Sequence, residues 1–235
     1  KMSDLKLAFF TSIEKILNLE SEYLFIVLTS LEVSLVAILI SSIISASIAS
    51  FLSMKKFYGR SVIIIFFNTM MSLPPVVVGL LLYILFANQG MFGSHNLLYT
   101  TNIMIIAQIV LITPILISLS KETIDRYFNE YNEFLISIHA PFMMRLLTLI
   151  WEARYVLITN LLVGLGRALS EVGAIIIVGG NIYNLTRTMT TGIVLETSRG
   201  DLTMALSLGI TLIFIAITIN IILYLFKIYG EKKYA

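Results

Sequence analysis

The sequence predicts an all-α integral membrane protein, and three observations support that fold class. Of its 235 residues, 58% are hydrophobic and only 13% are charged, whereas soluble domains carry roughly 25% charged residues. Five apolar stretches approach or exceed the ~20 residues that a helix needs to cross a bilayer. Nine of the thirty charged residues lie in one interval, 121–155, between two of these stretches. We therefore expect this interval to be the main contact with water.

The five predicted membrane spans form one transmembrane domain that covers residues 23–226. The spans are 23–53, 61–87, 103–118, 156–178 and 203–226. Residues 1–22 are expected to form an amphipathic helix, either at the membrane surface or packed on the rim of the bundle. Residues 227–235 form a polar tail.

The second span contains adjacent prolines, Pro74 and Pro75. Proline removes a backbone donor and bends a helix, and a membrane tolerates this where neighbouring groups satisfy the freed carbonyls. The bend is either a packing feature or a hinge of a gate, and the sequence leaves both interpretations open.

The distribution of Lys and Arg predicts the orientation of the chain. Ten of the sixteen fall on the side that contains the 54–60 turn, the 121–155 interval and the C-terminus, and five fall on the other side. Cytoplasmic loops carry the excess of basic residues. We expect the N-terminus outside and the C-terminus and residues 121–155 in the cytoplasm.

Several functional classes are excluded by composition and spacing. The chain has no cysteine, which excludes disulfides and thiolate metal sites. Its net charge of +2 gives no reason to expect nucleic acid, and His95 and His139 lie too far apart in sequence to suggest a pair of metal ligands. No phosphate-binding G-x-x-x-x-G-K-[ST] motif occurs, and no Ser/His/Asp arrangement is present. The sequence therefore predicts no enzyme and no bound metal, nucleotide or other cofactor in this chain.

The fourth span carries two opposite charges, Arg167 and Glu171. Charges near mid-membrane are costly and usually face a bundle interior or a cavity. Four residues apart on a helix, the two side chains share a face and can neutralise each other. They either fix the packing of this helix or line a translocation path.

The loop at 179–202 offers hydrogen-bond donors suited to an anion. Convergent N–H and O–H groups bind oxyanions, and the candidate contacts are Asn181, Thr186, Arg187 and Thr188. Solvated loops are commonly rich in Gly, Asn and Thr, so an ordinary surface loop is the alternative.

The first half of the polar interval has aromatic and aliphatic residues at helical spacing. They are Tyr127, Phe128, Tyr131, Phe134, Leu135 and Ile138. A helix with such an edge suits docking in a groove of a partner protein. The alternative is an interfacial helix that rests on lipid headgroups.

Two short runs are distinctive: Ser-Glu-Val-Gly-Ala at 170–174 and Val-Gly-Gly-Asn-Ile at 178–182. Together with the segments 73–81, 151–155, 164–169 and 186–191, they resemble the permease subunits of bacterial ABC importers for tungstate, whose relatives carry molybdate and sulfate. The resemblance spans about residues 28–225.

The resemblance implies a type I importer and a set of partners. These are a second copy of the permease, two cytoplasmic ATPase subunits that bind ATP and Mg²⁺, and an extracytoplasmic protein that delivers the oxyanion. The expected function is tungstate import through this chain across the cytoplasmic membrane of a bacterium or archaeon. The alternatives are a molybdate or sulfate permease, or a membrane scaffold without a substrate path.

The resemblance also implies a cytoplasmic coupling helix with a Glu-Ala-Ala-x-x-x-Gly motif. Matching this motif puts Glu133 at the Glu, Phe134 and Leu135 at the two Ala, and His139 at the Gly, so that only the Glu agrees. The predicted turn after it is His139-Ala140-Pro141. The residues expected to couple to an ATPase are Tyr131, Glu133, Phe134, Leu135, Ile138, His139, Ala140 and Pro141.

Overall fold

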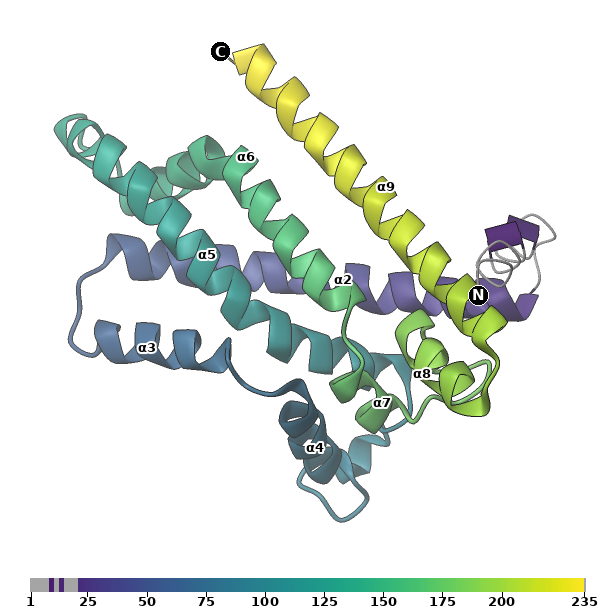
Figure 1. The fold of residues 1–235 in the computed structure, drawn as a ribbon. Helices are drawn as coiled ribbons and strands as arrows, with labels where there is room; N and C mark the ends of the chain where they lie inside the picture. Colours follow the sequence, from purple (N-terminus) through teal and green to yellow (C-terminus); the bar gives the residue numbers. More distant parts are fainter. Residues whose placement is uncertain (1–8, 11–12, 15–20, 235) are drawn as a thin grey trace. The chain divides into compact units, whose positions relative to one another are not determined.

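The structure is a computed structural model that describes residues 9–10, 13–14 and 21–234, with side chains described up to residue 228 beyond the N-terminal gaps. The surface helix predicted at 1–22 therefore lies almost wholly outside the described residues. Every regular element in the described part is helical, in agreement with the predicted fold class (Figure 1). The elements are α2 (Ser21–Met54), α3 (Arg60–Met70), α4 (Pro75–Phe86), η1 (Gly93–His95), α5 (Thr101–Ser137), α6 (Phe142–Leu169), α7 (Gly173–Gly179), α8 (Met189–Arg199) and α9 (Leu202–Tyr234).

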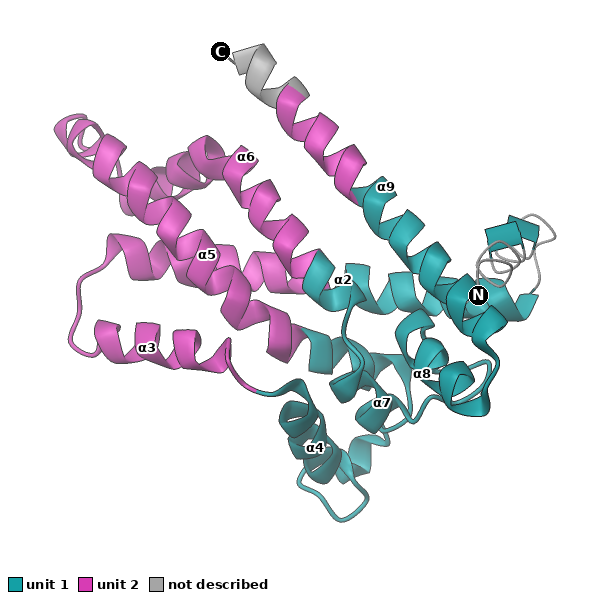
Figure 2. Ribbon diagram, in the orientation of Figure 1, with its two compact units in different colours: residues 1–37, 74–108, 166–219 teal, residues 38–73, 109–165, 220–235 magenta. Residues whose placement is uncertain are grey.

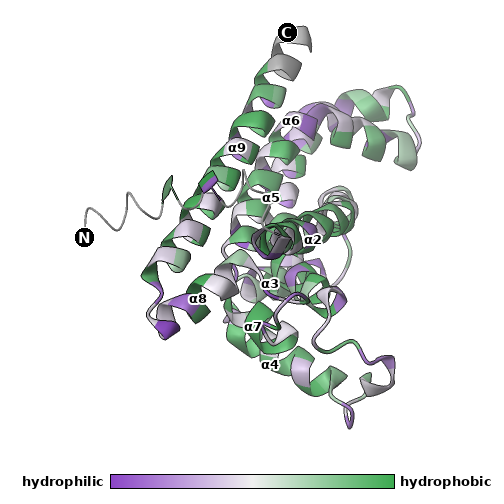
Figure 3. Ribbon diagram, turned by 90° about the vertical axis from the view of Figure 1, so that its right-hand side faces the viewer, coloured by the Kyte–Doolittle hydropathy of each residue, from purple (hydrophilic) through white to green (hydrophobic). Residues whose placement is uncertain are grey.

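Four of the described helices, α2, α5, α6 and α9, are long and apolar enough to cross a membrane. The pair α3 and α4 passes the same test together but is bent by 101° at its break, so the described residues hold four spans, or up to five. Figure 3 shows the long hydrophobic stretches of these helices and the hydrophilic residues in several of the connecting loops. The chain is a multi-pass membrane protein.

The chain folds into two compact units, which Figure 2 colours separately. The first comprises residues 1–37, 74–108 and 166–219, and the second comprises residues 38–73, 109–165 and 220–235. Each unit is described by itself below.

The two prolines lie at the start of α4 instead of inside a helix. Pro74 is the N-cap residue, with φ −62° and ψ 125°, and Pro75 is the first helical residue. The N–H groups at a helix start have no intrahelical partner, so proline costs no hydrogen bond there. The predicted second span, 61–87, is consequently two helices and not one bent helix.

Two other predicted boundaries differ from the structure. The helix predicted at 103–118 continues as α5 to Ser137, through half of the polar interval. The helix predicted at 156–178 begins earlier, at Phe142, and is interrupted between Leu169 and Gly173. The charged residues at 121–137 thus do not end the helix.

The first unit has a core built around Tyr23. This ring packs with Ile26, Met189 and Leu208, and its hydroxyl lies 2.6 Å from the Thr211 hydroxyl and donates to the Ser207 carbonyl at 3.0 Å. Burying a tyrosine in apolar surroundings requires a partner for its hydroxyl. These contacts join α2, α8 and α9.

The second unit has a core at Ala49, Ile124 and Leu149, from α2, α5 and α6. Tyr127, Phe128 and Tyr131 of α5 pack against it, and the rings of Tyr127 and Tyr131 stack with centroids 6.3 Å apart. The aromatic edge predicted on this helix is therefore partly used for packing within the chain.

In the first unit, α4 and α7 approach so closely that there is no room for a side chain at Gly79 or Gly173. A Cβ atom built on Gly79 would lie 2.7 Å from the Cα atom of Ala174, and one built on Gly173 would lie 2.7 Å from a methyl group of Val76. Small residues permit this contact between helix backbones.

We predict that Gly79→Ala destabilises the protein by about 1–3 kcal/mol, because the added methyl group must push the backbone of α7 away. The check is the thermal unfolding midpoint of the purified protein in detergent. The matched control is Gly166→Ala in α6, where an added Cβ meets no described atom within 4 Å. The control should unfold at the wild-type temperature or above it, since alanine favours a helix. Equal midpoints for both variants would contradict the close packing.

Candidate functional site

The interruption between α6 and α7 is stabilised by polar side chains from other elements of the first unit. Gln108 of α5 donates through Nε2 to the carbonyl of Ala168 at 2.9 Å. The last carbonyls of a helix lack an intrahelical partner, so Gln108 satisfies one of them at the end of α6. Thr190 of α8 donates to the carbonyl of Glu171, within the break, at 2.9 Å.

Glu171 connects the end of α6 to the start of α7. Its Oε1 accepts a hydrogen bond from the N–H of Ala174 at 3.1 Å, and its Oε2 lies 3.2 Å from the Arg167 guanidinium. The Glu171 side chain is buried, whereas that of Arg167 is partly exposed. The structure therefore brings the predicted pair together, although Glu171 lies beyond the last residue of α6 instead of on its face.

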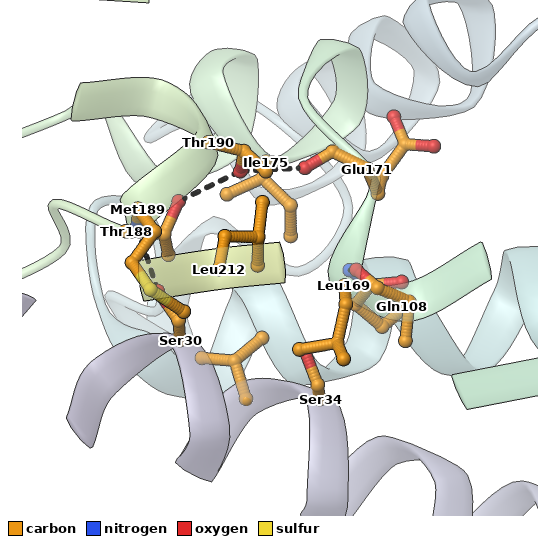
Figure 4. Close-up of a pocket in the computed structure, with 12 residues that line it drawn as sticks. Ser30, Ser34, Gln108, Leu169, Glu171, Ile175, Thr188, Met189, Thr190 and Leu212 are labelled. Carbon is orange, nitrogen blue, oxygen red and sulfur yellow. Dashed lines mark hydrogen bonds between the residues drawn. The ribbon is translucent and has the colours of Figure 1, made fainter. Parts of the chain in front are cut away.

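A small cavity of about 10 Å³ with mixed polar and apolar walls adjoins this break. Figure 4 shows Ser30 and Ser34 of α2, Gln108 of α5 and Thr190 of α8 around it. Gln108 is only 2% exposed, and its Oε1 has no hydrogen-bond partner among the described residues. A cavity of this size admits about one water molecule, which is too little space for a tetrahedral oxyanion.

The loop between α7 and α8 is held in one conformation by its own side chains. Thr186 donates to the carbonyl of Gly179 at 2.5 Å and accepts from the N–H of Ile182 at 2.9 Å. Gly180, Asn181 and Asn184 have positive φ values of 71°, 50° and 50°, which glycine and asparagine adopt most readily.

The hydroxyls of the predicted anion site are largely used within the loop. Thr188 is the N-cap of α8, and its side chain accepts from the N–H of Thr191. The Thr191 hydroxyl in turn donates to Oδ1 of Asn181 at 3.0 Å. Asn181, Thr186 and Thr188 thus form the framework of the loop.

Arg187 is the cationic side chain of this loop, and it is 8% exposed. Its guanidinium lies over the ring of Tyr183, 5.4 Å from the centroid, and its Nε has no hydrogen-bond partner among the described residues. A hydrogen bond from Tyr183 to the Glu22 carboxylate raises the pKa of the Tyr183 phenol above its ordinary value of 10.0. Tyr183 therefore stays neutral at physiological pH, and the contact with Arg187 is a cation–π contact.

The turn between α5 and α6, in the second unit, has a defined hydrogen-bond pattern. The N–H of Ala140 donates to the carbonyl of Leu135 at 3.1 Å, and that of His139 donates to the carbonyl of Ile136 at 2.9 Å. His139 has a φ of 54°. These are the bonds of a Schellman motif, in which the left-handed position is usually glycine. Pro141 then precedes the first residue of α6.

The structure places the residues predicted around this turn in two environments. Leu135 is buried and Tyr131 packs on the core of the second unit. Glu133, His139 and Pro141 are exposed, Ala140 is half-buried, and Phe134 and Ile138 are exposed apolar side chains. Further exposed apolar residues, which sequence analysis did not single out, are Ile136, Met143, Met144 and Leu147.

Sequence analysis also missed the ionic contacts of Asp125. Its carboxylate lies 2.5 Å from Nζ of Lys121 and 4.0 Å from the guanidinium of Arg60, whose Nε donates to the Leu52 carbonyl at 2.6 Å. The Lys121–Asp125 spacing of four residues could have indicated the first contact. Arg60 is distant in sequence, and no local pattern indicates it.

Within the part of the chain that the structure describes, no group of three or more His, Asp or Glu residues is placed to hold a metal ion.

We predict that Thr186→Val destabilises the protein by about 1–3 kcal/mol, because the N–H of Ile182 and the carbonyl of Gly179 both lose their partner. Valine has nearly the same shape, so packing is preserved. The matched control is Thr197→Val at an exposed position of α8, which should leave the unfolding midpoint unchanged. The same midpoint for both variants would refute the role of the Thr186 hydroxyl.

Comparison with characterised proteins places the chain in a family. No family model matches it, but individual relatives do. It is 32% identical over 216 residues to the tungstate uptake system permease protein TupB of Peptoclostridium acidaminophilum, which covers 92% of this chain and 95% of that protein. It is 38% identical over 160 residues to TupB of Campylobacter jejuni, covering 68% and 67% of the two chains.

A third relative comes from an archaeon, Haloferax volcanii, and is described as a probable anion ABC transporter permease protein. The identity is 34% over 196 residues, which cover 81% of this chain and 84% of the relative. The long apolar helices are those expected of a membrane permease, and the similarity to these relatives extends along most of the sequence. The chain therefore belongs to the family of ABC transporter permease subunits.

Proposed function

We propose that this chain is the permease of an ATP-driven importer for an oxyanion, with tungstate as the substrate. The observation that supports this most strongly is the similarity to a tungstate permease along 92% of the chain. Molybdate and sulfate are the alternative substrates, because all three are tetrahedral divalent oxyanions. A membrane scaffold without a substrate path is the alternative from another functional class.

The proposed assembly contains two copies of this chain, two cytoplasmic ATPase subunits and an extracytoplasmic oxyanion-binding protein. In this assembly ATP and Mg²⁺ bind to the ATPase. The chain would have five spans, counting α3 and α4 as one, with its N-terminus outside and its C-terminus in the cytoplasm. The excess of Lys and Arg at 54–60, at 121–155 and after residue 226 supports that orientation.

The α5–α6 turn is the proposed coupling segment. It exposes Phe134 and Ile138 next to Glu133, and exposed apolar side chains beside a charge suit insertion into a groove of a partner. Tyr131 and Leu135 would hold the segment against the second unit, because their side chains pack within that unit. His139, Ala140 and Pro141 would fix its shape.

The break between α6 and α7 and the start of α4 at Pro74 and Pro75 form the proposed gate region of the first unit. Discontinuous helices are common at substrate sites of transporters. The Arg167–Glu171 ion pair would hold the break together while Arg167 remains partly exposed. The cavity beside Gln108 is too small for the substrate, so we assign these residues to the gate and not to a closed binding site.

Arg187 is the proposed anion contact of the outer loop. Its burial, and the lack of a hydrogen-bond partner for its Nε among the described residues, favour a role in which an oxyanion accepts a charge-assisted hydrogen bond. Asn181, Thr186 and Thr188 would then act by holding the loop, because their polar atoms already bond within it.

Transport itself can be tested in vesicles that contain the chain with its ATPase and binding protein. We predict ATP-dependent uptake of tungstate that excess sulfate inhibits weakly. Arg187→Gln should lower the uptake about tenfold, the effect of losing ~1.4 kcal/mol of interaction. The control is Arg199→Gln, since Arg199 is exposed and paired with Glu196. Uptake that favours molybdate or sulfate would reassign the substrate, and ATP-independent binding alone would support a scaffold.

Coupling is tested in the same vesicles by Phe134→Ala and Glu133→Gln. Both variants should reduce tungstate uptake per ATP hydrolysed severalfold, because a side chain that fills the groove of the ATPase carries much of the docking energy. Phe214→Ala is the matched control, since Phe214 of α9 is 68% exposed and Phe134 is 63% exposed. An unchanged ratio of uptake to hydrolysis in Phe134→Ala would overturn the assignment.

A further inference from the structure

The buried amide of Gln108 has one polar atom that the described residues leave without a partner. Its Nε2 donates to the carbonyl of Ala168. A carbonyl can only accept, so this bond identifies the amide nitrogen, and the other amide atom, Oε1, is an acceptor. Oε1 is buried and has no hydrogen-bond partner among the described residues. The partner that this atom requires is therefore a donor.

The amide cannot satisfy itself by turning over. A rotation of 180° would bring Oε1 of Gln108 against the carbonyl oxygen of Ala168, and two acceptors do not bond. Buried polar side-chain atoms are nearly always bonded either to protein or to ordered water, because an unbonded one loses its hydration without compensation. Gln108 adjoins the cavity beside the α6–α7 break, so the donor can come from there.

The hydroxyl protons around this cavity are directed to other acceptors. Ser30 donates to the carbonyl of Ile26 at 2.9 Å, and Thr190 donates to the carbonyl of Glu171 at 2.9 Å, as Figure 4 shows. The Thr188 hydroxyl lies 3.2 Å from that of Thr190, to which it can donate. The donor for the amide oxygen is therefore a molecule within the cavity.

The cavity has the size and the polar groups for one water molecule. Its volume of about 10 Å³ is close to the ~10–15 Å³ that a single water needs, and a buried water makes two to four hydrogen bonds. Ser34 of α2 lines the same cavity, and its hydroxyl can accept from a water or donate to it. An ammonium ion is of similar size, but the carboxylate in the cavity wall, that of Glu171, is already paired with Arg167.

We propose that a water molecule resides in this cavity, donates a hydrogen bond to Oε1 of Gln108 and bonds to the hydroxyl of Ser34. The same amide holds the carbonyl of Ala168, so the water connects α2 to the end of α6 within the first unit. The interruption of the helix is then held by solvent as well as by side chains. This site is independent of the identity of the transported anion.

Met189 reports on this water, because its side chain is 0% exposed and lines the cavity. A brief X-ray pulse converts water to hydroxyl radicals, which oxidise methionine to its sulfoxide at short range. A buried methionine is therefore oxidised only where a bound water adjoins it. Met104 is the matched control, since it is also 0% exposed and does not line the cavity.

In the purified wild-type protein, mass spectrometry of peptides should show that Met189 is oxidised several times faster than Met104 at the same X-ray dose. Equal rates for the two buried methionines would overturn the proposal. This comparison within one chain requires no variant, so it holds even if a substitution at the cavity impairs folding.

Ser34→Val should remove the difference, because it replaces the hydroxyl and adds a methyl group that occupies the place of the water. Ser34→Thr, which retains the hydroxyl and adds only a methyl group, should act in the same direction. Ser47→Val, at an exposed position of α2 outside the cavity, should behave like wild type. Continued rapid oxidation of Met189 in Ser34→Val, with Met104 oxidised at its wild-type rate, would contradict the proposal, since the radicals would then arise elsewhere.

Discussion

The break between α6 and α7 imposes the main constraint on the first unit, because helix ends expose backbone groups that an apolar environment cannot hydrate. Each such group costs several kcal/mol when it is left without a partner. Gln108, Glu171 and Thr190 supply three of the required hydrogen bonds, to Ala168, to Ala174 and to Glu171 itself. Polar side chains that would be costly to bury within an unbroken span are thus needed where a helix is interrupted, because they bond the free backbone groups.

The same constraint explains the packing around α7. This helix has only seven residues, too few to be stable alone, so it depends on its neighbours. Gly79 and Gly173 allow the backbones of α4 and α7 to meet closely. The charge on Glu171 is compensated by Arg167 at 3.2 Å. Since Arg167 is partly exposed, solvent weakens the pair, and the hydrogen bond from Ala174 contributes to holding the carboxylate.

The sequence was sufficient for the helical membrane class, because a long apolar stretch is what a helix needs to cross a bilayer, but it did not give the bounds of the helices. It located a break at Pro74 and Pro75 but not its form, since proline serves equally at a bend and at a helix start. The sequence could not show which of Leu135 and Phe134 is buried at the α5–α6 turn. Both are apolar at adjacent positions, yet Leu135 is buried and Phe134 is exposed, and that difference depends on the tertiary packing of the helix.

The departure of the α5–α6 turn from the Glu-Ala-Ala-x-x-x-Gly motif has a structural explanation at its last position. His139 stands where the motif has glycine, and it has the left-handed φ of 54° that glycine adopts without strain. Histidine is among the non-glycine residues that tolerate this conformation. The backbone bonds from His139 to Ile136 and from Ala140 to Leu135 close the turn without any side chain. The geometry of the turn therefore does not depend on the alanines of the motif. In the proposed coupling role, residues such as Phe134 would be free to differ with the surface of the ATPase.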